Sequence, residues 1–335
     1  MSLAENYFAL SKNDQKEALE TAAGTTGLPP YLLEKDIWVV WALSALFQSK
    51  IASSLTFKGG TSLSKAYKII RRFSEDIDLT CDMRIFIPEA SESPVTSSQA
   101  KKWSDKIRKS LPVWIKEQII PIIESAFKKD GISARLEFDG NDKLLIHYPP
   151  LTKGVDYVSQ TIQLEFGARS TGEPNEKLPV TCDIADQIKG VAFPSTIPNV
   201  MRIERTFWEK ATAIHVYCHQ KEFPSDRFSR HWYDLVEISN TVYFASALRN
   251  RGLAQNVARH KDMFFKEKDS HKKVIDYAKA VSGKINLVPI DKAFYDLSLD
   301  YKKMTEAGLI LNPPDFENIM KSCRQIETKI NIDNQ

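Results

Sequence analysis

The sequence has little net charge, no long apolar run and no paired cysteine motif. Its 335 residues carry 46 lysines and arginines against 43 aspartates and glutamates, so the formal net charge is +3. This near balance excludes a uniformly basic, histone-like protein, although a basic surface and an acidic site can cancel within it. The longest apolar run, residues 37–47, is shorter than the roughly 20 residues of a membrane-spanning helix, so we expect no membrane segment.

The cysteines lack the spacing of a metal-binding or redox motif. The four are scattered along the chain: Cys81, Cys182, Cys218 and Cys323. Free thiols in a reducing compartment explain them most simply. Because the N-terminus shows no basic stretch followed by an apolar run, we expect a cytoplasmic protein. His215 and His219 flank Cys218 at helical spacing, which leaves zinc as a minor alternative.

Apolar residues make up 42% of the chain, enough for a sizeable core. This composition excludes a disordered tail protein and a disulfide-stapled miniprotein. The length suggests two domains. Helix and strand patterns alternate up to about residue 195, and almost everything beyond it has a helical pattern. We therefore predict an α/β or α+β domain over residues 1–195 and a helical bundle over residues 196–335.

The periodicity of apolar residues predicts the individual elements. In the first part we expect strands at residues 55–57, 76–81, 135–138, 144–148 and 161–166, and helices at 14–24, 30–47, 62–71 and 97–129. Proline at position 112 or 121 should break the last of these helices. In the second part we expect helices at 202–220, 227–248, 253–267, 271–283, 291–306 and 314–331.

Two aspartates separated by one apolar residue are the clearest chemical feature. Alternation along a strand places Asp76 and Asp78 on one side, while Ile77 and Leu79 enter the core. Two adjacent carboxylates repel each other unless a cation lies between them. Oxygen ligands of this kind suit Mg²⁺ or Mn²⁺. The pair therefore indicates a divalent-metal site.

A glycine pair precedes the aspartates by one short helix. Gly59 and Gly60 let the backbone approach a ligand closely. Thr61 and Ser62 add hydroxyls where the next helix begins, a place that favours anions. The segment is not a Walker P-loop, because no glycine precedes Lys65 in that frame. A phosphate-binding turn followed by a metal-binding pair is the minimum for phosphoryl or nucleotidyl transfer.

These segments together resemble the nucleotidyltransferase superfamily typified by DNA polymerase beta. More closely, they resemble the AbiEii/AbiGii toxin family of bacterial toxin–antitoxin and phage-abortive systems. The resemblance rests on KGGTSL (residues 58–63), RFSEDIDL (72–79), EKD (34–36), RTFWEK (205–210) and RHWYDL (230–235). It covers about residues 30–240. It implies an α+β fold, in which a nucleotidyltransferase-like mixed sheet with flanking helices is followed by a C-terminal helical bundle.

The resemblance also implies which residues form the site. A third metal carboxylate is expected on a later strand. Strand parity turns Glu165 away from the apolar residues beside it. Glu165 is preferred over the competitor Glu137, because the residues 167–169 that follow it (GAR) are a possible phosphate or nucleotide contact. The catalytic residues implied are Asp76, Asp78, Glu165, Lys210 and Asp234, with the first three as metal ligands. The nucleotide contacts implied are Gly59, Gly60, Thr61, Ser62, Lys65, Arg72, Ser74, Arg205 and Lys210.

Two of these assignments have structural alternatives. Lys210 lies at the margin of an apolar helix stripe, where it can also be a solvated lysine beside an Arg205–Glu209 pair. Asp234 shares an apolar stripe and needs a partner, which Arg230, four residues earlier, can provide. The sequence leaves open whether Asp234 is catalytic or structural.

The function implied is Mg²⁺-dependent transfer of a nucleotide from a nucleoside triphosphate to an RNA acceptor, with the 3′ end of tRNA as the suggested target. Asp76 or Glu165 would act as the base, and a cognate antitoxin is the expected partner. Basic stretches at residues 249–279 and 101–109 are candidate RNA contacts. The alternatives are a non-catalytic nucleotide- or RNA-binding protein on the same fold, and a metal-dependent nuclease.

Overall fold

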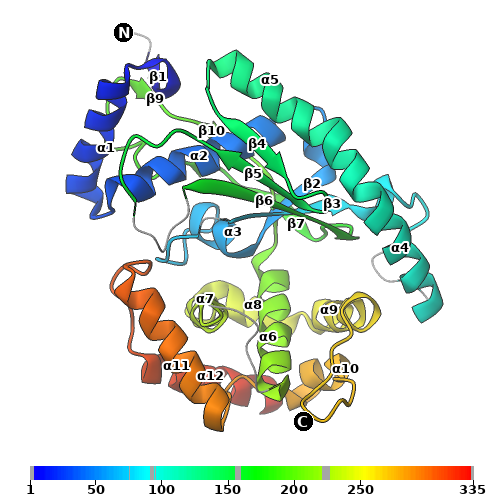
Figure 1. Cartoon of the computed structure of the whole chain (residues 1–335). Coiled ribbons are helices and arrows are strands. Elements are labelled where there is room, and N and C mark those ends of the chain that lie inside the picture. The colour runs from blue at the N-terminus through cyan, green and yellow to red at the C-terminus, as the bar shows by residue number, and fades with distance from the viewer. Residues whose placement is uncertain are drawn as a thin grey trace. The chain divides into compact units, whose positions relative to one another are not determined.

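The chain folds into two compact units, each assembled from separate stretches of sequence. This computed structural model describes residues 4–74, 76–90, 94, 96–154, 160–220 and 227–332. The first unit comprises Met1–Ala66, Phe73–Pro88 and Asp105–Val200. The second comprises Tyr67–Arg72, Glu89–Ser104 and Met201–Gln335. Strands are concentrated in the first unit and the second is mainly helical (Figure 1).

A seven-stranded mixed sheet forms the centre of the first unit, in the order β4-β5-β6-β3-β2-β11-β7. Its strands are β2 (Leu55–Lys58), β3 (Asp76–Asp82), β4 (Arg135–Phe138), β5 (Lys143–His147), β6 (Thr161–Ser170), β7 (Asn175–Lys177) and β11 (Asn199–Met201). The pairs β3–β6 and β2–β11 are parallel, whereas β2–β3, β4–β5 and β5–β6 are antiparallel. Two small ribbons, β1 (Glu5–Asn6) with β9 (Val191–Ala192) and β8 (Val180–Thr181) with β10 (Ser195–Thr196), lie outside it.

The sheet has one apolar face and one polar face. Residues that alternate along its central strands are fully buried: Leu55, Phe57, Ile77, Leu79, Leu144, Ile146, Ile162 and Leu164. Their neighbours in the chain point to the other face, where the side chains of Asp76, Asp78, Gln163 and Glu165 are half-buried. The parity predicted for Ile77 and Leu79 and for residues 162–166 is therefore confirmed.

Helices in the first unit anchor the sheet. They are α1 (Lys12–Thr26), α2 (Pro30–Phe47), α3 (Gly59–Lys65), α4 (Ser97–Trp114, shared with the second unit) and α5 (Ile120–Asp130). Helix α2 is buried on nearly every side and packs on α1, α5, β6 and β10. Between α4 and α5, Ile115–Ile119 form a π-helical turn, so the expected break lies between the two prolines. A wider turn accommodates a proline, which cannot donate the usual backbone hydrogen bond.

The second unit is built from seven helices among the residues that the structure describes. They are α6 (Ile203–Gln220), α7 (Arg230–Ser239), α8 (Val242–Arg249), α9 (Arg251–Phe264), α10 (Tyr277–Lys279), α11 (Asp291–Glu306) and α12 (Phe316–Ile332). The single helix expected at 227–248 is divided into the two helices α7 and α8. The Thr241 hydroxyl accepts from the Tyr243 amide and so caps the start of α8. Buried Trp208 and Trp232 donate to the carbonyls of Ala247 and Leu287, at 3.0 and 2.7 Å.

The α+β prediction is confirmed: a mixed sheet with helices, and C-terminal helices. Helix α3 differs from expectation, since it begins at Gly59 and ends at Lys65 rather than spanning 62–71. None of the helices in the described ranges combines the length and the apolar character needed to cross a bilayer.

Candidate active site

The predicted carboxylates line up across the polar face of the sheet. Asp78 on β3 lies opposite Glu165 on the parallel strand β6, and opposite Lys58 on β2. Asp76 lies opposite Gln163, two residues before Glu165 on β6. Adjacent strands are about 4.8 Å apart, so Asp78 and Glu165 are immediate neighbours. Two predicted metal ligands are thus side by side, with Asp76 on the same face of the same strand.

Glu137, the competing third carboxylate, lies elsewhere on the sheet. It is on strand β4, which is separated from β3 by β5 and β6. Its carboxylate contacts Arg135 at 3.1 Å and His147 at 3.0 Å. Three strand spacings amount to about 14 Å. The register therefore favours Glu165 over Glu137 as the neighbour of the aspartate pair, and the choice between them stays a prediction.

The glycine turn contacts the aspartate pair directly. Strand β2 ends at Lys58 and α3 begins at Gly59, whose φ is +77°, a conformation that favours glycine. A Cβ added at Gly59 would overlap Oδ2 of Asp78 and come within 2.9 Å of its Cγ. The carboxylate of Asp78 therefore lies against the backbone of the turn, as a cradle for phosphate and metal would require.

The hydroxyls of this segment serve to connect the turn to the acidic strand. Thr61 donates to the backbone carbonyl of Asp76, and its Oγ1 lies 2.9 Å from Oγ of Ser74. Ser62 donates to the carbonyl of Gly59 at 2.9 Å. Both Thr61 and Ser62 are fully buried. A phosphate at this turn would consequently meet backbone amides. Glu75, within the same motif, lies outside the described residues.

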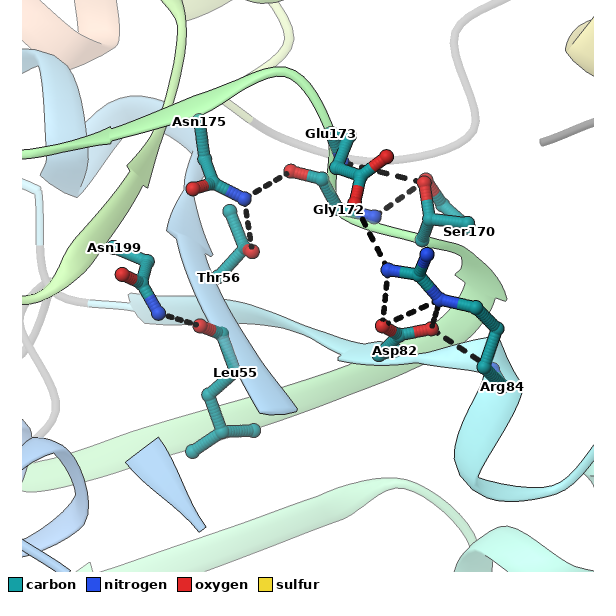
Figure 2. Close-up of polar contacts among 10 residues, drawn as sticks. Leu55, Thr56, Asp82, Arg84, Ser170, Gly172, Glu173, Asn175 and Asn199 are labelled. Carbon is teal, nitrogen blue, oxygen red and sulfur yellow. Dashed lines mark hydrogen bonds and ion pairs between the residues drawn. The ribbon is translucent and has the colours of Figure 1, made fainter. Parts of the chain in front are cut away.

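A third carboxylate on β3 has a separate role at the other end of the strand. Asp82 accepts hydrogen bonds from Arg84 at 2.6 to 2.9 Å, and Arg84 also reaches Glu173 at 2.9 Å (Figure 2). Beside them, the Asn175 amide donates to Oγ1 of Thr56 at 3.4 Å. These contacts tie β3 to the residues that follow β6. Because Arg84 neutralises Asp82, the metal candidates on β3 remain Asp76 and Asp78.

The carboxylates of the polar face fit a divalent cation by their chemistry and register. They offer only oxygen donors, which suit Mg²⁺ or Mn²⁺. In the part of the chain that the structure describes, no three His, Cys, Asp or Glu side chains already converge at metal-ligand spacing. The zinc alternative gains no support, since Nδ1 of His215 accepts from the backbone amide of Asn286 at 2.9 Å and Nε2 of His219 lies 3.1 Å from the side-chain amide of Asn286.

Lys65 lies in a buried ion cluster at the end of α3. Its Nζ lies 2.5 Å from Oδ1 of Asp36 on α2 and 2.6 Å from Oδ1 of Asp183. Oδ2 of Asp36 accepts from the Asp183 amide at 2.7 Å. Burial raises the pKa of Asp36 to about 6, although Lys65 opposes this. These ion pairs hold the end of α3 against α2. The nucleotide contact that the resemblance implies for Lys65 stays a prediction.

A second buried ion cluster lies within the second unit. Nε and Nη2 of Arg72 donate to both carboxylate oxygens of Asp234, at 2.6 and 2.8 Å. Nζ of Lys210 lies 2.8 Å from Oδ2 of the same carboxylate. Asp234 is completely buried, and Arg72 and Lys210 nearly so. Lys210 is therefore buried and is not a solvated surface lysine. Asp234 pairs with Arg72 and Lys210, two partners that the sequence of α7 could not indicate.

The pKa values in this cluster follow from burial and charge. Burial alone would raise the pKa of Asp234, but Arg72 and Lys210 hold it below its ordinary value. Burial lowers the pKa of Lys210, and Asp234 opposes this shift. Nε of Arg205 contacts Glu209 at 3.0 Å, as expected from their spacing. The predicted site residues thus fall into two groups, one in each unit.

Sequence reasoning missed two residues that hold the first group in place. Asp36 was noted only within the EKD motif, and nothing in the local sequence pointed to Asp183. Glu34 of the same motif also contacts a distant part of the chain. Its carboxylate accepts from the amides of Leu151 and Thr152, at 2.7 and 3.1 Å. An acidic residue inside an apolar helix is the one signal that could have indicated these anchoring roles.

Comparisons with known proteins identify a family and one similar solved structure. A family model described as nucleotidyl transferase AbiEii toxin, Type IV TA system, matches residues 41–322. The chain is also similar to a solved structure of MenT4, a nucleotidyltransferase toxin from Mycobacterium tuberculosis H37Rv. The identity is 17% and the TM-score 0.42, over 98% of this chain and 100% of that one. The search of curated proteins gave no match. The family match begins within α2 and ends within α12.

Proposed function

The chain belongs to the AbiEii nucleotidyl transferase toxin family of Type IV toxin–antitoxin systems, and we propose that it transfers a nucleoside monophosphate from a nucleoside triphosphate to RNA. Family membership makes it a nucleotidyltransferase toxin with a triphosphate substrate and an antitoxin counterpart. The acceptor is the further step of the proposal, and the 3′ end of tRNA is the first to test.

The contact between Gly59 and Asp78 carries the proposal. It joins a backbone turn suited to phosphate with a carboxylate pair suited to metal, as nucleotidyl transfer requires. Polyphosphate bound at the turn would place its charge beside Asp76, Asp78 and Glu165. A divalent cation held by these residues would neutralise that charge and polarise the phosphoryl oxygens. Asp76 or Glu165 would accept the proton of the attacking hydroxyl in this proposal.

The residues of the second unit take a supporting part in the proposal. Arg72, Arg205 and Lys210 are proposed as triphosphate contacts because the family resemblance implies that role. Each is buried and already paired with Asp234 or Glu209, so a triphosphate would compete with that carboxylate. Asp234 is proposed as a positioning residue that fixes Arg72 and Lys210, since its carboxylate oxygens are already occupied by both cations.

Label transfer tests the function directly. The purified chain is incubated with Mg²⁺, RNA and each of the four α-³²P-labelled triphosphates in turn. We expect label on RNA from one or more triphosphates, and none with Asp76→Ala or Asp78→Ala. Strand cleavage without label would indicate a nuclease instead. Binding of triphosphate with neither reaction would indicate a non-catalytic protein.

The third carboxylate is tested by a matched pair of variants. Glu165→Gln keeps the side-chain size but removes the charge beside Asp78, so transfer should fall by at least about 100-fold, the order lost with one electrostatic contact to the transition state. Glu137→Gln removes the same charge on strand β4 and should leave the rate within about threefold of the wild type. Equal losses in both variants would show that the register does not identify the ligand.

A further inference from the structure

The exposed face of α12 is basic and hollowed. Lys321, Arg324, Gln325, Thr328 and Lys329 line a shallow depression of about 630 Å³. All five are exposed, and they follow one another at the three- and four-residue spacings of a single helix face. The lining therefore presents three cations and two uncharged hydrogen-bonding side chains to solvent.

Two acidic residues of α12 lie close to these cations in the sequence: Glu317, which is exposed and four residues before Lys321, and Glu327. Glu327 is half-buried, and its Oε2 accepts from the Leu287 amide at 2.6 Å. Among the residues that the structure describes, no carboxylate forms an ion pair with Lys321, Arg324 or Lys329. Lys329 instead lies 5.5 Å from the centre of the Phe244 ring. The positive charge of the face is thus left for a partner.

Three exposed lysines elsewhere in the second unit are paired with acids and serve as a comparison. Lys279, Lys292 and Lys302 have ion pairs with carboxylates on their own helical segments, at 3.2, 2.7 and 3.7 Å. Their side chains are 70%, 81% and 69% exposed, so they differ from the cations of α12 in pairing rather than in access. A phosphate that binds the unpaired cations of α12 displaces no carboxylate, whereas one that binds these lysines competes with an exposed pair worth about 0–1 kcal/mol.

We propose that this face of α12 binds the phosphate backbone of RNA. The choice of RNA rests on the function proposed above, and it assigns the acceptor a docking surface outside the predicted catalytic residues. Lys321 and Lys329 are eight residues apart, which is about 12 Å along the helix. That length matches three to four phosphates at 3.4 Å of axis per phosphate on one strand. Gln325 and Thr328 would add hydrogen bonds to phosphate oxygens.

The chemistry of α12 favours RNA over an anionic membrane. An interfacial helix needs an apolar face that enters the lipid. The apolar side chains from Ile319 to Ile330 on α12 are buried in the protein core, and the lining of the depression contains none. The contact is therefore expected to be electrostatic and independent of RNA sequence.

The test compares two triple variants of the full chain that lose the same charge. Lys321→Gln, Arg324→Gln and Lys329→Gln remove the unpaired cations. Lys279→Gln, Lys292→Gln and Lys302→Gln remove the paired ones. Affinity for a fluorescent tRNA pool is measured from 50 to 300 mM KCl without triphosphate, and thermal melts check folding. The α12 variant should lower the slope of log K against log salt by about 2 to 3, at 0.7–0.9 per phosphate contact.

At 100 mM KCl this change of slope corresponds to roughly 100-fold weaker binding, and the control variant should keep the wild-type slope. Equal slopes in all three proteins would overturn the inference. So would loss of binding to phosphatidylglycerol vesicles in the α12 variant with RNA affinity unchanged. Label transfer is assayed in parallel. Transfer with unchanged slopes would refute the docking surface alone, whereas a reduced slope without transfer would refute the proposed activity alone.

Discussion

Removing the charge of Asp234 should unfold the protein at much lower denaturant concentration, because two buried cations would lose their counter-charge. Asp234 is 0% exposed, and its oxygens accept from Arg72 and Lys210 at 2.6 to 2.8 Å. Breaking a buried ion cluster from one side costs about 3–5 kcal/mol. For Asp234→Asn this corresponds to a fall in Tm of roughly 6–20 °C, at 2–4 °C per kcal/mol.

The stability of the Asp234→Asn variant should also depend on pH, which gives a second, independent test of the cluster. Without Asp234, the pKa of buried Lys210 falls further below its ordinary value, because its main opposing charge is gone. The folded state then binds fewer protons than the unfolded state between that lowered pKa and about 10.4, so stability rises with pH in this window. The deficit of Asp234→Asn relative to wild type should therefore narrow between pH 7 and pH 9.5.

Urea unfolding followed by tryptophan fluorescence measures both effects, since Trp208 and Trp232 are buried in the same unit. Asp296→Asn is the matched control. It breaks the exposed Lys292–Asp296 pair of the same unit and should cost less than about 1 kcal/mol. A deficit for Asp234→Asn below 1 kcal/mol at pH 7, or one that widens with pH, would refute the account of this cluster.

Three further predictions concern the first unit. Gly59→Ala places a Cβ onto Oδ2 of Asp78 at a φ of +77°, so transfer should be lost while a circular-dichroism spectrum shows the fold retained. Lys65→Met leaves the buried carboxylate of Asp36 without its cation. Protonation of Asp36 removes the unpaired charge, and burial already raises the pKa of Asp36 to about 6. Urea unfolding should therefore show a larger loss of stability at pH 8 than at pH 5. A chelator should abolish transfer and added Mg²⁺ restore it, whereas transfer that survives dialysis against EDTA would contradict a metal-dependent reaction.

Local sequence patterns predicted the polar face of the sheet well. Alternation alone placed Asp76 and Asp78 on one side, and the same rule turned Glu165 out of the core. These features depend on residues one or two positions apart, where backbone geometry decides the outcome. The helices of the second unit were also largely predicted, because apolar periodicity extends over several turns.

Contacts between distant residues could not be predicted in the same way. Arg72 and Asp234 are 162 residues apart, and Lys65 pairs with Asp183 over 118 residues. In each case the sequence shows the lysine or arginine, and only the fold reveals the distant carboxylate with which it pairs. The short strands β7 to β11 were missed for a related reason. Each has two or three residues, too few for alternation to be read.

The mass of an RNA acceptor tests the central claim most directly. Purified tRNA is incubated with the chain, Mg²⁺ and each triphosphate separately, and intact masses are compared with those obtained with Asp78→Asn. The account predicts an increase equal to one or more nucleoside monophosphates with the wild type and no change with the variant. An unchanged mass with every triphosphate, for tRNA and for total RNA, would contradict nucleotide transfer to RNA.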